Sequence, residues 1–513
     1  MRRLFVCFLC AVCVFVWAQE DWHKALQDYL RAETREEAGK YLDTLQKVGA
    51  AELLTAVQKG LTYKKEESGW VELKAEGMPA TLYVPPKYDA AKPAPILFFL
   101  HGAVNRPQFV PLKGLKKYIA YFWKEKADKD GWFLCAPASK RGLMWWQAEG
   151  TRALEELLRR IKRRYNIDER RVWVGGFSDG GSGAFHLAAH APTHFAALIP
   201  LNGNPMVPDR YGAPVFVENF KNRPVYAIHT ERDPLYPAAA MKPIMDAAKK
   251  VGANLVHRIP AGTHRPNYLP NELPKIADFL AKNTLKPPSS ITWFVTDTKN
   301  YGRCDWLVVR QLKKGIGEKP DCVNPTTKPR KVLGVRIDTK FAGHGVRVIG
   351  VAKGTAAAAA GILPGDVITK LAGKNVKNLS DLREAIKDLA PEKPFSVTVQ
   401  RGGNTLTRST KLPKRKPKPV FTRPELWGAV TASFSENDGR LKIKAYNVSK
   451  LTILLTHPLF EPGKNLQIEV NGKVVYSGTP QIDVGTLLKF ARTDMNRNAV
   501  VWGRVDVEIE ESK

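Results

Sequence analysis

Ser178 lies in a stretch of sequence that is typical of a serine nucleophile. The apolar, β-type run Val172–Val174 leads into Gly-Phe-Ser-Asp-Gly at positions 176–180, and an apolar helical pattern follows. A strand, a sharp turn and a helix in this order lift a serine hydroxyl clear of a sheet edge, at a helix N-terminus that favours negative charge. Gly176 and Gly180 leave room for the turn because they have no Cβ atom. The pattern predicts a nucleophile; a serine that only caps the helix is the alternative.

An acid and a base follow Ser178 in the order that such a site needs. Asp233 comes shortly after the apolar strand 225–228, and His264 lies on the loop after the strand 254–259. Parallel strands end at the same edge of a sheet, so these side chains can converge there. We predict Ser178 as nucleophile and His264 as general base and then general acid. Asp233 is predicted to orient His264 and stabilise its imidazolium.

Several residues compete for these roles. Glu231 is the rival acid and ranks below Asp233. The rival histidines lie on the helix after Ser178 or at positions that match no expected site; they are His186, His190, His194 and His229.

An oxyanion hole requires two backbone N–H donors. We expect one from Asp179, directly after the nucleophile. The other is expected from Ala103, in the loop that follows the apolar strand 95–100. Trp145 and Trp146 follow a later strand; they are interpreted either as a substrate-binding wall or as a hydrophobic cover for the sheet.

The elements that would position these residues alternate between strand and helix. From residue 69 to about 286, short apolar runs alternate with helical patterns, and 95–100 is continuously apolar, as a buried parallel strand should be. The expected fold class is α/β, with a doubly wound parallel sheet over 67–286. Residues 19–66 are interpreted as a helical segment packed on that domain, with a capping box at Thr34 and Glu37.

Residues 69–286 resemble the α/β-hydrolase superfamily, especially exported esterases of the feruloyl, acetylxylan and polyhydroxybutyrate-depolymerase kind. They are also similar to the catalytic domain of the prolyl oligopeptidase family. His-Gly at 101–102, Gly-Phe-Ser-Asp-Gly-Gly at 176–181, Asp-Pro at 233–234 and Gly-Thr-His at 262–264 carry the resemblance. It implies ester or amide hydrolysis through an acyl-enzyme. Residues 19–68 are too few for the β-propeller of true prolyl oligopeptidases, which favours esters.

A second resemblance covers about 330–413. The run 354–366, with Gly-Ile-Leu-Pro-Gly-Asp at its end, is similar to that of PDZ domains of the bacterial protease-associated type. The resemblance implies that the amides of Leu333, Gly334 and Val335 capture a terminal carboxylate and that a peptide C-terminus adds a strand beside them. A PDZ fold used only as a spacer is the alternative.

Basic, proline-bearing linkers flank the PDZ segment at 312–331 and 413–419. Residues 288–312 and 420–513 are rich in strand patterns. Two strands before the PDZ segment would make a stub with little core. We therefore predict that 288–312 and 420–513 form one split, β-sandwich-like domain with the PDZ domain (330–413) inserted between its strands.

Net charge and an N-terminal targeting signal indicate possible partners and a cellular location. The 513 residues include 80 Lys and Arg against 50 Asp and Glu, a formal net charge of +30. This excess permits binding of an acidic polymer or surface through the basic linkers, but no specific nucleic-acid motif accompanies it. Residues 1–18 resemble a signal peptide, which predicts export to the periplasm or secretion. Cys135 is expected to be a buried thiol, and pairing of Cys304 with Cys322 is left open.

Together these features predict an exported serine hydrolase that cleaves small-molecule or glycan-linked carboxylic esters, with no metal or cofactor. A serine peptidase is one alternative. A binding protein with PDZ and β-sandwich modules and a vestigial hydrolase is another.

Overall fold

The computed structural model describes residues 22–510, apart from 74–76, 328 and 330. The expected signal peptide lies outside the described residues. Apart from the residues just excluded, the chain divides into two compact units, 22–325 with 420–510 and 326–419.

An eight-stranded sheet organises the first unit, in the order β1-β2-β4-β3-β5-β6-β7-β8. From β4 to β8 neighbouring strands are parallel, and β1 and β2 add an antiparallel edge. The strands are β1 (Gly69–Leu73), β2 (Ala80–Val84), β3 (Ala94–Leu100), β4 (Phe133–Pro137), β5 (Ile167–Phe177), β6 (Ala197–Leu201), β7 (Val225–Ile228) and β8 (Leu255–Arg258). The strand order doubles back at β3 and runs outward through β5, so this is the doubly wound arrangement that the sequence predicts.

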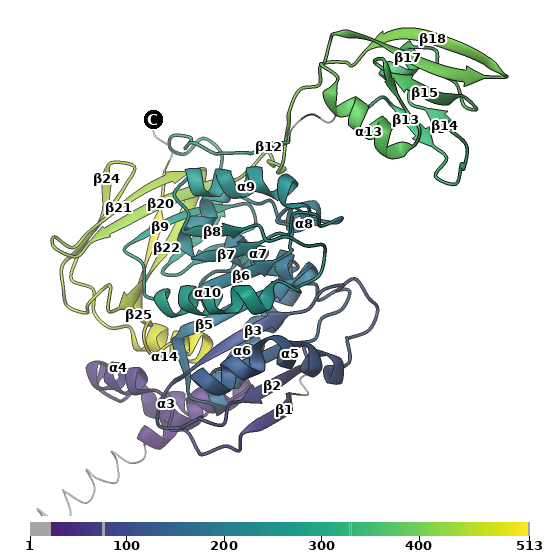
Figure 1. Ribbon diagram of the computed structural model, residues 1–513. Helices are drawn as coiled ribbons and strands as arrows, with labels where there is room; N and C mark the ends of the chain where they lie inside the picture. The colour runs from purple at the N-terminus through teal and green to yellow at the C-terminus, as the bar shows by residue number, and fades with distance from the viewer. Residues whose placement is uncertain (1–21, 74–76, 328, 330, 511–513) are drawn as a thin grey trace, which may run out of the picture. The chain divides into compact units, whose positions relative to one another are not determined.

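Helices cover both faces of this sheet, the blue and teal part of Figure 1. They are α5 (Leu112–Asp130), α6 (Ala148–Arg164), α7 (Asp179–His190), α8 (Met206–Arg210), α9 (Ala238–Lys250) and α10 (Leu269–Lys282), with a 3₁₀ turn, η1 (Val217–Asn222). Strand β3 shows why its sequence is continuously apolar. Ile96 and Phe98 pack in the core with α6, α7 and α9, whereas Leu97 and Phe99 pack on the other face with α5 and α10.

Two further sheets complete the first unit. One has the order β24-β23-β21-β20-β9 and the other β10-β11-β22-β25. Their strands are β9 (Ser290–Val295), β10 (Arg303–Cys304), β11 (Leu307–Leu312), β20 (Gly428–Ser435), β21 (Arg440–Tyr446), β22 (Val448–His457), β23 (Leu466–Val470), β24 (Lys473–Gly478) and β25 (Val500–Glu508). Along the chain, helix α11 (Thr298–Tyr301) comes between β9 and β10, and helix α14 (Val484–Asp494) comes between β24 and β25. Strands from before and after the PDZ segment pair directly, β9 with β20 and β11 with β22. We call these two sheets with α14 the β region.

The N-terminal helices share the core of the β region. They comprise residues 22–31, α2 (Arg35–Gly39), α3 (Leu42–Leu45) and α4 (Ala50–Lys59). Leu26, Leu53 and Val57 are buried in one cluster with Trp306, Leu487 and other side chains of the β region. The capping box of Thr34 and Glu37 is present. The apolar face of this segment thus joins a core built largely from the C-terminal strands. The end of the segment also contacts the domain next in sequence, where Tyr63 donates to the carbonyl of Lys162 at 3.0 Å and Glu66 pairs with Arg164 at 2.6 Å.

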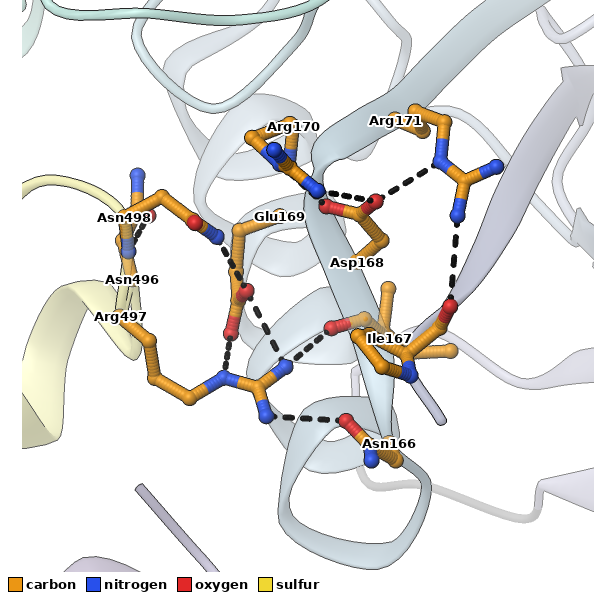
Figure 2. A network of polar contacts seen from close by, with 10 residues as sticks. Asn166, Ile167, Asp168, Glu169, Arg170, Arg171, Asn496, Arg497 and Asn498 are labelled. Carbon is orange, nitrogen blue, oxygen red and sulfur yellow. Dashed lines mark hydrogen bonds and ion pairs between the residues drawn. The ribbon is translucent and has the colours of Figure 1, made fainter. Parts of the chain in front are cut away.

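A buried charge network ties the β region to the start of β5, as Figure 2 shows. Arg497 donates to the carboxylate of Glu169 at 2.8 and 3.2 Å, to Oδ1 of Asn166 at 2.9 Å and to the carbonyl of Ile167 at 2.7 Å. Asn498 donates to the same carboxylate at 3.1 Å. Glu169 is only 4% exposed. The β region is therefore fixed to the sheet by buried polar contacts as well as by the chain.

The second unit has its own sheet and core. Its strands run in the order β13-β14-β15-β17-β18, with β16 paired to β15. They are β13 (Val335–Ile337), β14 (Val346–Val351), β15 (Val367–Leu371), β16 (Lys374–Asn375), β17 (Pro394–Arg401) and β18 (Asn404–Lys411), and the helices are α12 (Ala356–Ala359) and α13 (Leu379–Asp388). A two-stranded ladder, β12 (Thr326–Thr327) with β19 (Lys418–Pro419), closes the unit where the chain enters and leaves it.

Candidate active site

The turn between β5 and α7 holds Ser178 in a strained conformation. Its φ is 60° and ψ is −119°, in a region that L-residues rarely occupy. Glycine is required on both sides of it. A Cβ atom on Gly176 would lie 2.4 Å from the backbone of Gly180, and one on Gly180 would lie 1.9 Å from the carbonyl oxygen of Leu100. The turn therefore packs against the end of β3, and the serine is held at the carboxyl edge of the sheet.

The structure brings Ser178, His264 and Asp233 into one hydrogen-bonded chain. His264 Nε2 lies 2.9 Å from Ser178 Oγ, and its Nδ1 lies 2.8 Å from Asp233 Oδ2. An ionised carboxylate only accepts, so Nδ1 carries the proton and Nε2 is left to accept from the serine hydroxyl. The arrangement is that of a nucleophile, a general base and an orienting acid.

Asp233 is almost fully buried, yet it is stabilised as a carboxylate. Burial by itself raises the pKa of this group, but its hydrogen-bond donors outweigh burial and lower the pKa below its ordinary value. Oδ1 accepts the backbone N–H groups of Leu235 at 2.8 Å and Tyr236 at 2.9 Å. Oδ2 accepts from His264 and from the side-chain amide of Asn202 at 2.7 Å. The charge that orients His264 is thus held in place by four donors.

The rival residues lie elsewhere. Glu231, on the same loop as Asp233, is exposed, and it is Asp233 that pairs with His264. His186 and His190 stack on each other inside α7, and burial lowers the pKa of both. His229 bonds to the carbonyl of Gly203 and to His257. Burial lowers the pKa of His194 to about 3.

The loop expected to supply the second oxyanion donor lies against the nucleophile. A Cβ atom on Gly102 would lie 3.0 Å from that of Ser178, so only glycine lets the loop approach this closely. Ala103 has a φ of 55°. The next N–H group, from Val104, donates to the carboxylate of Asp179 at 2.9 Å. This bond links the residue after the nucleophile to the residue after Ala103, and sequence reasoning did not anticipate it. That the Asp179 and Ala103 N–H groups bind an oxyanion stays a prediction.

Trp145 and Trp146 do not form a substrate wall. They are 2% and 4% exposed and pack in the core on one face of the sheet. The indole N–H of Trp145 donates to the carbonyl of His101 at 2.9 Å, so this side chain supports the loop before Ala103. The alternative interpretation, a hydrophobic cover for the sheet, describes both residues, because both side chains are buried in the core on one face of the sheet.

His101 is a scaffold residue that sequence reasoning left without a role. Its Nε2 accepts the backbone N–H of Ser139 at 3.0 Å, which places the ring proton on Nδ1, 2.7 Å from the carbonyl of Gly102. Burial lowers the pKa of His101, in keeping with a neutral ring.

In the second unit, the predicted peptide-binding residues lie at the edge strand of the sheet. Leu333 is buried in the core of that unit, and Val335 begins β13. Gly334 has a φ of 94°, and a Cβ atom there would lie 2.2 Å from Thr355. Their placement is compatible with strand addition beside β13; carboxylate capture stays a prediction.

Other features of the described residues bear on chemistry. No group of three or more His, Cys, Asp or Glu in them could hold a metal ion, and no described helix could cross a membrane. Cys135, Cys304 and Cys322 are free thiols, so the pair that the sequence left open is not formed.

Comparison with known proteins agrees with this geometry. Residues 147–284 match the family described as Phospholipase/Carboxylesterase, and residues 329–412 match the PDZ domain family. The chain carries a serine hydrolase domain of the carboxylesterase class and a PDZ domain.

Curated relatives resemble parts of this chain. This chain is 26% identical over 174 residues to the bifunctional acetylxylan esterase/xylanase XynS20E of Neocallimastix patriciarum. The match covers 33% of this chain and 22% of that protein. It is 38% identical over 69 residues to the putative serine protease HhoB of Synechocystis sp. (strain ATCC 27184 / PCC 6803 / Kazusa), covering 14% and 15%. The chain thus spans less than a quarter of the length of either relative.

Among solved structures, a thermostable esterase is similar at 22% identity, with a TM-score of 0.36, covering 42% of this chain and 62% of that one. A ferulic acid esterase is similar at 14% identity, with a TM-score of 0.34, covering 42% and 98%.

Proposed function

We propose that the protein is an exported serine hydrolase that cleaves carboxylic esters through an acyl-enzyme on Ser178. The observation that carries the proposal is the continuous hydrogen-bonded chain from Ser178 Oγ through His264 to the buried carboxylate of Asp233. The match of 147–284 to the carboxylesterase family supports ester substrates. The resemblance to an acetylxylan esterase supports an acyl group carried on a glycan.

Each step of the proposed reaction is assigned to a residue of this site. His264 Nε2 takes the hydroxyl proton as Ser178 Oγ attacks the ester carbonyl, and Asp233 stabilises the imidazolium that forms. The N–H groups of Asp179 and Ala103 are assigned to the developing oxyanion. His264 then gives its proton to the leaving alcohol, and the acyl-enzyme remains. Water, activated by His264 in the same way, attacks the acyl-enzyme and releases the acid and free Ser178.

Replacement of the nucleophile tests the proposal. Ser178→Ala is expected to abolish hydrolysis of p-nitrophenyl acetate and labelling by a fluorophosphonate, while thermal unfolding stays near that of the wild type. Ser433→Ala, on the exposed side of β20, is the matched control and should keep both signals. Unchanged turnover in Ser178→Ala, or a fluorophosphonate adduct mapped to another residue, would reject the assignment. A wild-type protein that neither turns over nor labels would favour the vestigial-hydrolase alternative.

Substrate class, location and partners need their own tests. A panel of p-nitrophenyl acyl esters against aminoacyl and dipeptidyl amides separates an esterase from a peptidase. Sequencing the N-terminus of the mature protein tests cleavage after residue 18. For the PDZ domain we propose a peptide C-terminus as ligand, and for the basic linkers an acidic polymer. Loss of peptide binding on C-terminal amidation, and loss of polymer binding at high salt, are the expected results.

A further inference from the structure

Asn202 occupies a special backbone position between the strands that carry the nucleophile and the acid. It follows β6, which lies between β5 and β7 in the sheet. Its φ is 44°, in the left-handed region, and its side chain is fully buried. Its N–H donates to the carbonyl of Ile228, the last residue of β7, at 2.8 Å. A strained, buried asparagine whose backbone is tied to the neighbouring strand is held there by the surrounding structure.

The side-chain amide of Asn202 joins the acid loop to the histidine loop. Nδ2 donates to Asp233 Oδ2 at 2.7 Å and to Thr230 Oγ1 at 3.0 Å, and Oδ1 accepts the hydroxyl of Tyr268 at 2.5 Å. Thr230 in turn donates to the carbonyl of Thr263, the residue before His264, at 2.8 Å. The network therefore reaches the two loops that carry the acid and the base.

Chemistry determines which way this amide points. The carboxylate of Asp233 can only accept hydrogen bonds, and the hydroxyl of Thr230 already donates its proton to the carbonyl of Thr263. The NH₂ end of Asn202 must therefore face both groups, which leaves Oδ1 facing Tyr268. Tyr268 is the donor that keeps the amide from turning over.

We propose that Asn202, held by Tyr268, is a positioning residue of the hydrolytic site, which fixes Asp233 Oδ2 in line with His264 Nδ1. The inference rests on the proposed ester hydrolysis by the same site. One carboxylate oxygen receives both the amide of Asn202 and the imidazole N–H of His264. The amide supplies a donor without a charge, so the negative charge that stabilises the imidazolium stays uncancelled.

Removal of the amide tests the proposal. Asn202→Leu is expected to lower kcat for p-nitrophenyl acetate about 10- to 100-fold, the range that follows from losing one hydrogen bond to a charged group. KM should change less than twofold, because the side chain of Asn202 bonds to Asp233, Thr230 and Tyr268, none of which is assigned to substrate binding. Tyr268→Phe should lower kcat in the same direction but less. The control is Asn219→Leu, another buried asparagine, which donates to the carbonyls of Ala189 and Phe294 and should lower stability without lowering kcat at 25 °C.

The pH profile separates positioning from a merely structural role. In Asn202→Asp the new carboxyl can donate to Asp233 only while it is protonated, and once ionised it repels Asp233. Its activity should fall on the alkaline side, where the wild type stays active, while Asn219→Leu keeps the wild-type profile.

The outcomes distinguish this inference from the function on which it rests. A wild-type protein without esterase activity rejects the proposed function. An active wild type, together with an Asn202→Leu variant of unchanged kcat or an Asn202→Asp variant of unchanged pH profile, rejects the role of Asn202 alone.

Discussion

Two buried carboxylates, Asp233 and Glu169, are stabilised in opposite ways. Asp233 receives neutral donors and the imidazole of His264, and among the described residues no arginine or lysine pairs with it. Glu169 receives the guanidinium of Arg497 and an amide from Asn498 (Figure 2). A guanidinium cancels the charge it binds, whereas neutral donors stabilise a charge and leave its field in place. The first carboxylate is suited to stabilise an imidazolium and the second to join distant segments.

Neutralising Asp233 should have the largest effect. Asp233→Asn is expected to lower kcat roughly 10³- to 10⁴-fold, because an amide neither fixes the tautomer of His264 nor stabilises its cation. The thermal midpoint should fall modestly, since the amide keeps the shape of the side chain but its NH₂ end cannot accept from the buried donors that now bond to the carboxylate. Steady-state hydrolysis of p-nitrophenyl acetate and differential scanning fluorimetry measure the two effects. Asp246→Asn, in an exposed pair with Lys242, is the control. A loss of less than tenfold would show that the charge of Asp233 is not used.

Breaking the pair at Glu169 should act on stability instead. Arg497→Ala leaves a buried carboxylate without its partner, at an expected cost of about 3–5 kcal/mol in the free energy of unfolding. Turnover at 25 °C should stay near that of the wild type in the fraction that remains folded. Urea unfolding measures the change. The control is Arg504→Ala, in an exposed pair with Asp506, where the expected change is below about 1 kcal/mol. Equal effects of the two variants would contradict the structural role of Glu169.

A third carboxylate, Asp179, sharpens the comparison because its oxygen accepts from the backbone of another loop, at Val104. Asp179→Ala removes the partner of the Val104 N–H and frees the loop that carries Ala103. We expect kcat to fall about tenfold, the order of magnitude for one hydrogen bond to a charged group. Asp179→Asn keeps an acceptor oxygen and should recover most of the activity. If Asp179→Asn is as slow as Asp179→Ala, the loss of kcat comes from the lost charge and not from a displaced loop.

Excision of the second unit should have the smallest effect. The N–H of Val420 donates to the carbonyl of Pro325 at 2.8 Å, so the chain ends left by removing 326–419 already lie side by side. A chain with Pro325 joined to Val420 through a short Gly-Ser linker should fold and hydrolyse p-nitrophenyl acetate with kcat/KM within about twofold of the wild type. Unfolding of this variant would show that the PDZ domain supports the first unit.

Local patterns in the sequence were sufficient for several features. The glycines around Ser178 predict the turn because only glycine fits where backbones approach within van der Waals distance. The apolar runs predict a sheet buried on both faces, and the Gly-Ile-Leu-Pro-Gly-Asp run predicts the PDZ domain. Each of these signals depends on neighbours in the chain.

Other features depended on contacts between distant segments. Trp145 and Trp146 have the composition of a binding wall, but the fold buries them. The sequence of the N-terminal helices predicts an apolar face, but it does not predict that C-terminal strands cover this face. Asn202 carries no local signal, since its partners Asp233 and Tyr268 come from other loops.

The sequence by itself therefore predicted a candidate nucleophile, the order of acid and base and the PDZ segment, because turn glycines and the spacing of apolar residues are visible in adjacent residues. The sequence ranked Asp233 above Glu231, but only the tertiary structure pairs Asp233 with His264, brings Asn202 to the same carboxylate and joins the β region to the sheet through Arg497. Those outcomes depend on contacts between side chains that are far apart in the sequence. Such contacts form only when the sheet, its loops and the β region have packed together.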